Sequence, residues 1–428
     1  MGQESDEDAS SGEKNKMEPE RKIKMKKTVL TLCLVLAMLL VHVAGPAASA
    51  EARQVTAWGN YCTNYTFFYM PSSFDNQTLR AVLTLGISGS GLTIEFSNKH
   101  GAEPVVLDHV SFAPVAEGTQ SDIVPDSAQD VLFSGETYVS IPAGETVISD
   151  VITAPVQAGS QYAVSYYIAG QYQTSSGNAF NAVVYTAGEN GDHVADAEVN
   201  GEIAAVVPYL RSIRVITEDE AAKAFVIVGD STSSNAWPGM LQARLEEVGL
   251  DNISVIPRAV SGNRLMVDAE SPFFGEGAVN RFDEDVYGTD GVFAVLIKIG
   301  VNDLFHPVTS GTEAFTVEEM IAAEEALAES AHAHGLKVYM MTITPFNGYE
   351  SRGYGNVWTE DLEQMRLAWN DWIRTTDCID GYVDLCPGMT DPADATMLLD
   401  KYTVDHLHPS DLGLAFITNA VPLEWFVK

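Results

Sequence analysis

Positively charged residues are scarce in this chain of 428 residues. Lys and Arg number 24 against 59 Asp and Glu, which leaves a formal net charge of −35. A surface with so much negative charge repels nucleic acid and anionic membranes, because both are negatively charged themselves. The composition therefore excludes a nucleic-acid-binding function.

Cysteine is also rare, with four residues in the whole sequence. Cys33 lies in an N-terminal segment that we expect to be removed, so Cys62, Cys378 and Cys386 remain, and an odd number cannot all pair. Cys378 and Cys386 could close a small loop in an oxidising compartment, or stay reduced and pack as small hydrophobic side chains. No cysteine spacing resembles a zinc site.

No apolar tract dominates the sequence apart from one in the N-terminal extension, which we place at 1–50. A short basic segment precedes an apolar run at 28–43, and Ala48-Ser49-Ala50 offers the small-x-small pattern that signal peptidases cut. We expect cleavage after Ala50 and translation from Met17 or Met25. The alternative is a single anchoring helix, but the run is shorter than the roughly 20 residues that a bilayer core requires. The sequence therefore predicts a secreted or cell-surface-associated protein without stable membrane insertion.

Residues 51–220 have the pattern of β-structure. Short stretches alternate polar and apolar residues and are rich in Val, Ile, Tyr and Thr, which favours strands. We expect strands at 66–70, 80–86, 92–97, 138–141, 162–168 and 182–186. Turn sequences such as Ser88-Gly89-Ser90-Gly91 separate them. Many short strands at this spacing indicate an all-β antiparallel sandwich of the jelly-roll kind.

The pattern changes at the charged segment 217–220, where we place a domain boundary. Beyond it, in 221–428, strands alternate with helices. We expect strands at 225–228, 254–257, 292–299 and 338–343, and helices at 238–248, 317–334 and 362–374. This alternation predicts parallel pairing through crossovers, in a three-layer α/β/α domain. Catalytic groups in such a sheet gather at the carboxyl ends of the strands.

Gly229-Asp230-Ser231 directly follows the first strand of this domain and precedes its first helix. A Ser at this strand tip would expose its hydroxyl in the crevice, and Gly229 permits the sharp turn. Such triplets also occur in ordinary strand-end turns, where Asp and Ser satisfy backbone groups. Ser231 is therefore a candidate nucleophile that needs partners elsewhere in the chain.

Two further strand ends carry groups suited to bind an oxyanion. Gly262 follows the second strand, and a glycine there offers a backbone N–H that no side chain shields. Asn302 follows the next strand and could donate from its side chain. The alternatives are a plain turn at Gly262 and an Asn302 that caps the next helix.

Asp405-His406-Leu407-His408 is the most informative motif. An Asp three residues before a His can place both on one face of a tight turn. Asp405 can then orient the imidazole of His408 as it deprotonates Ser231. His406 is the competing base, but it is adjacent to Asp405 and should point away from the pocket if His408 points in. We therefore expect a triad of Ser231, His408 and Asp405.

In this order the four elements resemble those of the SGNH hydrolase superfamily, also called the GDSL esterases and lipases. The resemblance implies that Ser231 is the nucleophile and first oxyanion donor. It implies that Gly262 and Asn302 are the other donors, and that His408 is the general base with Asp405 as its partner.

The resemblance extends over 224–426 and implies a flavodoxin-like α/β/α fold with a parallel sheet. The sequence departs from the family in two places. Thr232-Ser233-Ser234-Asn235 follow the nucleophile where the family more often has Ile or Leu. Lys298 interrupts an apolar strand where the family prefers aliphatic residues, and its side chain could extend to an end of the sheet.

The N-terminal half resembles the β-sandwich that is fused to some secreted bacterial members of this superfamily. The landmarks are 55–58, 92–98 and 141–144. This resemblance implies an accessory sandwich packed on the hydrolase, with neither a metal nor an organic cofactor.

Family resemblance and secretion together predict an esterase that removes acetyl or other short acyl groups from glycan or small-molecule esters. Loops at 273–275, 305–307 and 346–358 should frame the pocket with aromatic and polar side chains that can stack on sugar rings. The same side chains could instead anchor these loops to the core. The expected substrate-binding residues are Asn263, Phe305 and His306.

Two other functions remain open at this point. A lipase or lysophospholipase of the same family is disfavoured, because no long apolar lid or exposed amphipathic helix is evident. A catalytically inert carbohydrate-binding protein is disfavoured, because such a protein would not need every group of a triad and an oxyanion hole at strand ends.

Overall fold

The computed structural model describes residues 52–66, 73–351 and 353–427. The predicted signal peptide, its cleavage after Ala50 and Cys33 lie outside the described residues, as does most of the strand predicted at 66–70. Within the described residues, no helix has the length and apolar character that crossing a membrane requires.

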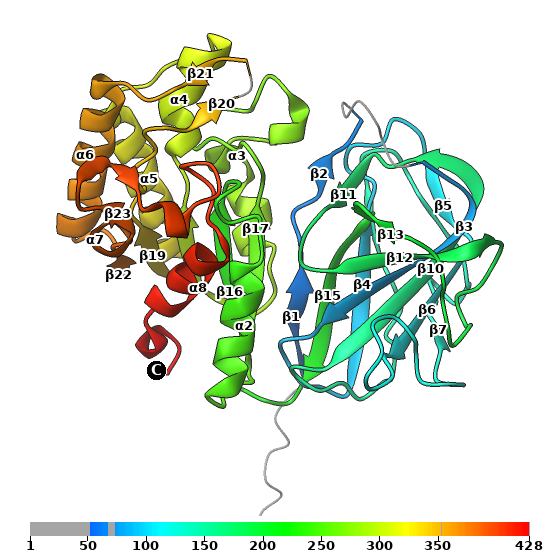
Figure 1. Ribbon diagram of the computed structural model, residues 1–428. Helices are drawn as coiled ribbons and strands as arrows, with labels where there is room; N and C mark the ends of the chain where they lie inside the picture. The colour runs from blue at the N-terminus through cyan, green and yellow to red at the C-terminus, as the bar shows by residue number, and fades with distance from the viewer. Residues whose placement is uncertain (1–51, 67–72, 352, 428) are drawn as a thin grey trace, which may run out of the picture. The chain divides into compact units, whose positions relative to one another are not determined.

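From residue 52 to residue 217 the chain forms antiparallel sheets (Figure 1). The strands are β1 (Arg53–Gly59), β2 (Thr63–Asn64), β3 (Ser73–Thr84), β4 (Gly91–Ser97), β5 (Val105–Leu107), β6 (His109–Pro114), β7 (Gln129–Asp130), β8 (Val139–Ile141), β9 (Thr146–Ile148), β10 (Gln161–Gln173), β11 (Ser176–Asn178), β12 (Val183–Asn190), β13 (Ile203–Ala204), β14 (Val207–Pro208) and β15 (Leu210–Thr217). One main sheet has the order β1-β15-β4-β9 and the other β13-β12-β3-β10-β6-β7, with smaller sheets β14-β11-β2 and β5-β8 beside them. The predicted all-β sandwich is confirmed.

The two main sheets bury residues that alternate along their strands. In β10, Val164 and Tyr166 are fully buried, as are Ile94 and Phe96 in β4 of the other sheet. The rings of Phe96 and Tyr166 meet edge to face with their centroids 5.7 Å apart. Successive strand residues point to opposite faces of a sheet, so each strand contributes every second side chain to the core between the sheets.

The rest of the described chain is an α/β domain around a parallel sheet (Figure 1). Its strands are β16 (Lys223–Gly229), β17 (Ile253–Ala259), β18 (Val292–Lys298), β19 (Lys337–Met341) and β22 (Gly381–Val383), with small hairpins made of β20 (Glu350–Ser351), β21 (Gly355–Asn356), β23 (Thr390–Asp391) and β24 (Asp394–Leu398). The order β17-β16-β18-β19-β22 places β16, β17 and β18 side by side.

The helices lie between these strands in the sequence. They are α2 (Trp237–Glu247), α3 (Ala278–Phe282), α4 (Val301–Ser310), α5 (Val317–Ala333), α6 (Glu360–Thr375), α7 (Cys386–Met389) and α8 (Asp411–Ala420), with the shorter turns η1 (Pro272–Phe274), η2 (Asp283–Tyr287), η3 (Asp400–Tyr402) and η4 (Leu423–Trp425). The start of α5 is fixed by a capping box, in which Thr316 and Glu319 satisfy each other's backbone N–H groups.

Both faces of the parallel sheet are covered by helices. Phe225 and Ile227 of β16 pack with α2 and α8, through residues such as Trp237 and Ile417. Val226 and Val228 of the same strand point the other way and join the core that contains residues of α3, α5 and α6. A strand buried on both faces reads as a continuous apolar run, which is why β16 was recognisable in the sequence. The predicted three-layer α/β/α fold is confirmed.

Strand β1 of the sandwich packs against β17, the outermost strand of the parallel sheet. The hydroxyl of Ser254 donates to the carbonyl oxygen of Thr56, and Arg258 donates to that of Asn60. On the sandwich side, Lys99 forms ion pairs of 2.8 Å with the carboxylates of Glu276 and Glu284. The sandwich and the parallel sheet are therefore joined by buried hydrogen bonds as well as by charge.

Candidate active site

Three neighbouring strands of the parallel sheet end at the same level. Gly229, the last residue of β16, is in register with Ala259 at the end of β17 and with Lys298 at the end of β18. The segments that follow these strands carry Ser231, Gly262 and Asn302. The register therefore gathers the predicted nucleophile and both predicted additional oxyanion donors at one edge of the sheet.

The turn after β16 holds Ser231 through its neighbours. The carboxylate of Asp230 accepts hydrogen bonds from the backbone N–H and the hydroxyl of Thr232, at 2.8 and 2.7 Å. The carbonyl oxygen of Asp230 accepts from the N–H groups of Ser233 and Ser234, each at 2.9 Å. A Cβ atom at Gly229 would lie 2.7 Å from that of Ser233, so the tight turn requires glycine there.

His408 and Asp405 complete a chain of hydrogen bonds with Ser231. Nε2 of His408 lies 2.9 Å from Oγ of Ser231, and its Nδ1 lies 2.7 Å from Oδ2 of Asp405. Two hydrogen bonds close the loop that carries Asp405 and His408. The Val404 N–H and the Thr403 hydroxyl both donate to the carbonyl oxygen of His408, at 3.0 and 2.9 Å. The structure thus brings together the three residues that the sequence singled out, from segments 177 residues apart.

The environment of Asp405 favours its ionised form. Partial burial by itself raises the pKa of this carboxyl, but hydrogen bonds from the His408 ring and backbone and from Leu407 N–H hold the pKa below its ordinary value. A carboxylate in this position fixes the imidazole so that Nε2 faces the serine. His406 has a positive φ of 68°, and its ring lies against Gly348 instead of facing Ser231.

Two backbone N–H groups lie at the strand ends with no acceptor. Neither Ser231 nor Gly262 donates its N–H to another group of the described residues. Gly262 has a φ of +74°, and a Cβ atom there would lie 2.3 Å from the ring of Phe274. The side chain of Asn302 donates to the carbonyl oxygen of Asn263 at 2.9 Å, which leaves its second N–H hydrogen for another acceptor. These donors have the chemistry of an oxyanion hole.

The comparison with protein families bears on the segment that holds all of these groups. Residues 226–415 match the sequence model of the GDSL-like lipase/acylhydrolase family. Residues 226–415 therefore form a GDSL-like acylhydrolase domain, and the enzyme class that this domain indicates is an ester hydrolase. The comparison with curated protein sequences found no match.

Solved structures similar to this chain include a GDSL-like lipase from Bacteroides thetaiotaomicron. It is 22% identical, the similarity covers 46% of this chain and 85% of that one, and the TM-score is 0.36. An acetyl xylan esterase is 17% identical over 46% of this chain and 96% of its own, with a TM-score of 0.36. A variant of an acetyl-xylooligosaccharide esterase from Geobacillus is 17% identical over 48% of this chain and 94% of its own, with a TM-score of 0.35.

The acylhydrolase domain contains an anchoring carboxylate that the sequence reasoning missed. Asp303 is buried and accepts hydrogen bonds from the N–H groups of Leu265 and Met266, at 2.7 and 3.2 Å. Burial raises the pKa of Asp303 to about 6, although these hydrogen bonds and Arg264 act in the opposite direction. Asp303 therefore ties the segment that carries Gly262 to the start of α4. Its position next to Asn302 at a strand end was the available signal.

Asn263, one of the predicted substrate-binding residues, has protein partners in the structure. This residue is fully buried, and its amide nitrogen donates to the carbonyl oxygens of Phe274 and Glu276, both at 2.8 Å. Its side-chain oxygen accepts from Arg281 at 2.8 Å. With both ends of the amide occupied by protein groups, Asn263 holds the loop after β17 in place and has no free group for a ligand.

The segment 305–307 was predicted as a pocket loop and instead belongs to helix α4. Phe305 is buried, with its ring 6.2 Å from that of Phe346 and 5.4 Å from that of Tyr349. Phe305 therefore packs among aromatic side chains, and its predicted role in substrate binding stays a prediction. His306 is only partly buried, and its ring lies 5.7 Å from that of Phe274, which itself packs on Gly262.

His306 and Phe274 line a cavity of about 300 Å³. Polar and aromatic side chains dominate its lining, among them Arg264, Glu270, Ser271, Thr312 and Tyr354. Burial and, to a smaller extent, the nearby charge of Arg264 lower the pKa of His306 to about 4, so this imidazole is neutral at pH 7. A neutral imidazole can both donate and accept a hydrogen bond.

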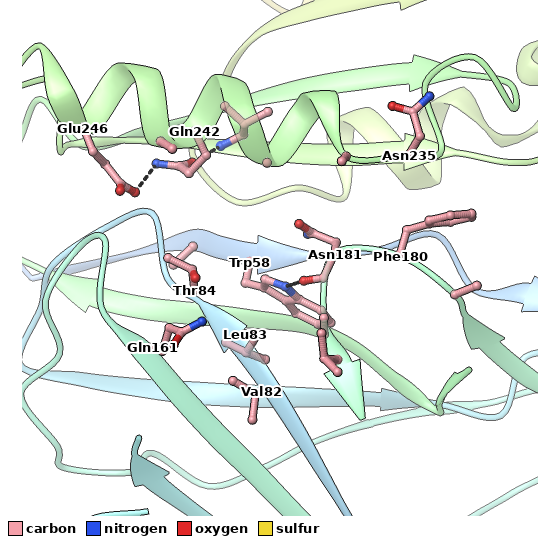
Figure 2. A pocket seen from close by; sticks show the side chains of 18 residues that line it. Trp58, Val82, Leu83, Thr84, Gln161, Phe180, Asn181, Asn235, Gln242 and Glu246 are labelled. Atoms are coloured by element: carbon pink, nitrogen blue, oxygen red, sulfur yellow. Dashed lines mark hydrogen bonds between the residues drawn. The ribbon is translucent and has the colours of Figure 1, made fainter. Parts of the chain in front are cut away.

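A larger cavity of about 480 Å³ lies elsewhere, between α2 and the sandwich (Figure 2). None of the triad residues lines it, and none lines the cavity beside His306. Gln242 on the α2 side donates to Glu246 at 2.9 Å and accepts from Val255 N–H at 2.7 Å, and Asn181 on the sandwich side donates to Gly59. These polar groups already have protein partners, so the candidate active site lies at the strand ends and not in this groove.

Lys298 reaches the carboxyl end of the parallel sheet but does not reach solvent. The residue is 8% exposed, and its ammonium group donates to the hydroxyl of Thr232. Burial lowers the pKa of Lys298, and the negative charge of Asp230 counteracts part of this effect. The suggestion that this side chain extends to an end of the sheet holds, but the ammonium is buried there.

Cys62, Cys378 and Cys386 are free thiols among the described residues. Cys378 and Cys386 therefore do not close a loop, and the second of the two alternatives applies. Within the described residues, no group of three or more His, Cys, Asp or Glu side chains is arranged to hold a metal ion.

Proposed function

We propose that the protein is a secreted serine esterase that removes short acyl groups, foremost acetyl, from carbohydrate or glycoside esters. The hydrogen-bonded chain from Ser231 through His408 to Asp405, at 2.9 and 2.7 Å, is the observation that carries the catalytic part of this proposal. Export rests on the segment before Ala50, which lies outside the described residues.

In the first half of the proposed reaction, Oγ of Ser231 attacks the ester carbonyl carbon and its proton passes to Nε2 of His408. The carbonyl oxygen becomes an oxyanion, stabilised by the N–H groups of Ser231 and Gly262 and the side chain of Asn302. His408 then gives its proton to the departing alcohol oxygen, which leaves an acyl-enzyme on Ser231. Asp405 stabilises the positive imidazole between the two transfers.

The second half mirrors the first with water as the nucleophile. His408 takes a proton from water, the hydroxide oxygen bonds to the acyl carbon, and the same donors bind the second oxyanion. The bond from the acyl carbon to Ser231 Oγ then breaks, and His408 returns the proton to the serine. No step requires a metal or a redox cofactor.

The cavity next to His306 supports a carbohydrate substrate over a lipid. Its lining includes a neutral imidazole, several hydroxyl groups and the ring of Tyr354, and Ala269 is the one aliphatic residue among the described residues that line it. Hydroxyl groups and aromatic faces match the polar edges and apolar faces of sugar rings, whereas a fatty acyl chain would need an aliphatic lining.

The test is hydrolysis of p-nitrophenyl esters from acetate to palmitate, and of acetylated xylan, by the chain from Glu51. Ser231→Ala and His408→Ala should abolish the activity. His193→Ala is the matched control, because His193 pairs with Asp196 at 2.7 Å with the same spacing but in the sandwich. Activity on long chains would favour a lipase, and hydrolysis that survives Ser231→Ala would overturn the proposed site.

A further inference from the structure

We propose that Lys298 is a positioning residue of the acylhydrolase site, whose buried ammonium group neutralises Asp230 and holds, through Thr232, the turn that carries Ser231. This inference rests on the proposed role of Ser231 as nucleophile. It gives a function to the one charged residue in an otherwise apolar strand.

The contacts form a short chain around the nucleophile. Lys298 ends β18 in register with Gly229 at the end of β16, so its side chain starts directly beside the nucleophile turn. Its ammonium donates to the hydroxyl of Thr232, and that hydroxyl donates to the carboxylate of Asp230 at 2.7 Å. Asp230 and Thr232 are the neighbours of Ser231 in sequence. The three side chains therefore hold the nucleophile from both sides.

Burial makes the charges dependent on each other. Asp230 is 1% exposed and Lys298 is 8% exposed. An isolated buried charge is strongly unfavourable, whereas a buried pair of opposite charges that also satisfies its hydrogen bonds is tolerated. Two other cations nearby have carboxylate partners of their own: Arg281, which donates to the carbonyl oxygen of Gly229 and to Asn263, pairs with Asp285, and Arg264 pairs with Asp303. Lys298 is therefore the cation that compensates Asp230.

Asp230 and Lys298 also lie near the loop that carries Asp405 and His408. Asp230, Thr232 and Lys298 line a cavity of about 10 Å³ together with Leu407. Leu407 lies between Asp405 and His408, and its N–H donates to Asp405 at 3.1 Å. A change in the Lys298 side chain would therefore disturb the packing beneath both the nucleophile turn and the histidine loop.

The chemistry explains why a cation belongs there. The reaction develops a negative charge on the oxyanion close to Ser231, and the negative charge of the buried Asp230 would oppose it. The positive charge of the Lys298 ammonium offsets the negative charge of Asp230. The oxyanion donors therefore stabilise the oxyanion without opposition from a net negative charge beside Ser231. An effect on the developing charge changes kcat, whereas KM, which depends on binding of the neutral ester, changes little.

The experiment compares Lys298→Gln with the double variant Lys298→Gln/Asp230→Asn, using p-nitrophenyl acetate. Glutamine retains a donor for Thr232 but removes the charge, so kcat should fall on the order of 10- to 100-fold with little change in KM. Asparagine in place of Asp230 still accepts from Thr232 and needs no counter-charge. The double variant should therefore recover most of the lost kcat.

Lys298→Met and Lys298→Met/Asp230→Asn repeat the comparison with an apolar side chain of similar length, and thermal unfolding of each variant shows which are folded. A purely structural role predicts that both changes lower stability additively and that the double variant is less active than either single one. That result, or full kcat in Lys298→Gln, would overturn the proposal. Ser231→Ala is measured alongside: if it retains activity, the proposed function fails, whereas its inactivity beside a fully active Lys298→Gln refutes this inference alone.

Discussion

Arg80 in the sandwich and Glu324 in the acylhydrolase domain are both almost fully buried, but their surroundings differ. Arg80 donates to the hydroxyl of Ser165 at 2.9 Å and to three backbone carbonyl oxygens at 2.6 to 3.2 Å. Glu324 accepts one hydrogen bond, from the indole N–H of Trp369 at 2.7 Å, and burial raises its pKa to about 8. Burial moves the pKa of Arg80 towards the neutral form as well, to about 10. The difference is that Arg80 has four protein acceptors, whereas Glu324 has one protein donor.

The difference extends beyond these two residues. In the acylhydrolase domain, Asp303 and Lys298 are also buried with pKa values moved towards the neutral form, and both lie behind the strand ends that carry the candidate site. Buried groups with displaced pKa values are typical of sites that move protons or stabilise charge. A displaced pKa alone does not separate the two regions, because Arg80 has one as well. The comparison indicates a difference in location: Arg80 binds structural carbonyl groups of the sandwich, whereas Lys298 and Asp303 bind segments that carry the candidate site.

The largest expected effect is a loss of catalysis in the acylhydrolase domain. Asp405→Asn keeps the shape of the side chain but cannot fix the imidazole of His408 in the required tautomer, so kcat should fall on the order of 10³- to 10⁴-fold. Steady-state kinetics with an acetyl ester measures it. Asp411→Asn, at the exposed start of α8, is the control and should keep full activity. A loss of less than about tenfold would show that Asp405 does not orient the base.

The next effect concerns the backbone at the strand ends. Gly262→Ala places a Cβ atom 2.3 Å from the Phe274 ring and should displace the N–H donor, with a loss of about 10² in kcat. Gly335→Ala is the matched control, because Gly335 also has a positive φ, of 78°, but its Cβ atom would meet no atom within 4 Å. Gly335→Ala should lower the stability without changing kcat. Equal kinetic losses in both variants would mean that backbone strain alone explains the effect.

The sandwich side is tested by Arg80→Leu. The substitution leaves the carbonyl oxygens of Ser121 and Asp196 without this donor and removes one of two donors to that of Ala197, which still accepts from Ile123 N–H. The free energy of unfolding should fall by about 2 to 4 kcal/mol. Urea denaturation measures this change. At a temperature where the variant is folded, kcat should stay unchanged. A parallel fall in kcat would contradict the proposal that buried charge in the sandwich serves stability and not catalysis.

The smallest effect is a pH dependence that originates at Glu324. Its folded pKa of about 8 lies above the ordinary 4.5, so between these values the folded chain binds a proton that the unfolded chain has lost. The free energy of unfolding should therefore fall as the pH rises from 4.5 towards 8. Glu324→Gln, which still accepts from Trp369, should flatten this slope and gain about 1 to 3 kcal/mol at pH 8.

Denaturation at several pH values measures the slope, with Glu325→Gln as the control. Glu325 is the next residue of α5 and accepts from the indole N–H of Trp372 at 3.2 Å on the surface. Its substitution should leave the pH dependence as in the wild-type chain. A wild-type slope that survives Glu324→Gln would assign the proton to another group.

Much of the fold could be predicted from the sequence, because the decisive signals are local. The run from Phe225 to Val228 and the turn residue Gly229 together indicate a buried strand that ends in a tight turn, and β16 has these bounds to within a few residues. The pairing of Asp405 with His408 also depends on a short turn, so their spacing predicted the contact that the structure shows.

Other features of the site depend on tertiary packing and could not be predicted in this way. Asn263 follows a strand end just as Asn302 does, but Arg281, from a helix further along the chain, occupies its side-chain oxygen. The segment with Phe305 and Pro307 looked like a loop because proline usually interrupts helices, yet Pro307 lies inside α4. Lys298 could be identified as unusual, but its partner Thr232 was visible only in the folded chain.

The packing of β1 against β17 has a bearing on how the chain folds during synthesis. Strand β1 is made early, yet its ladder partner β15 begins at Leu210, and Ser254 and Arg258, which donate to the carbonyl oxygens of Thr56 and Asn60, are made later still. Contacts of such long sequence separation form slowly. Nearly the whole sandwich must therefore be synthesised before β1 can pair with β15. A fragment starting at residue 221 would expose Ser254 and Arg258 without their acceptors.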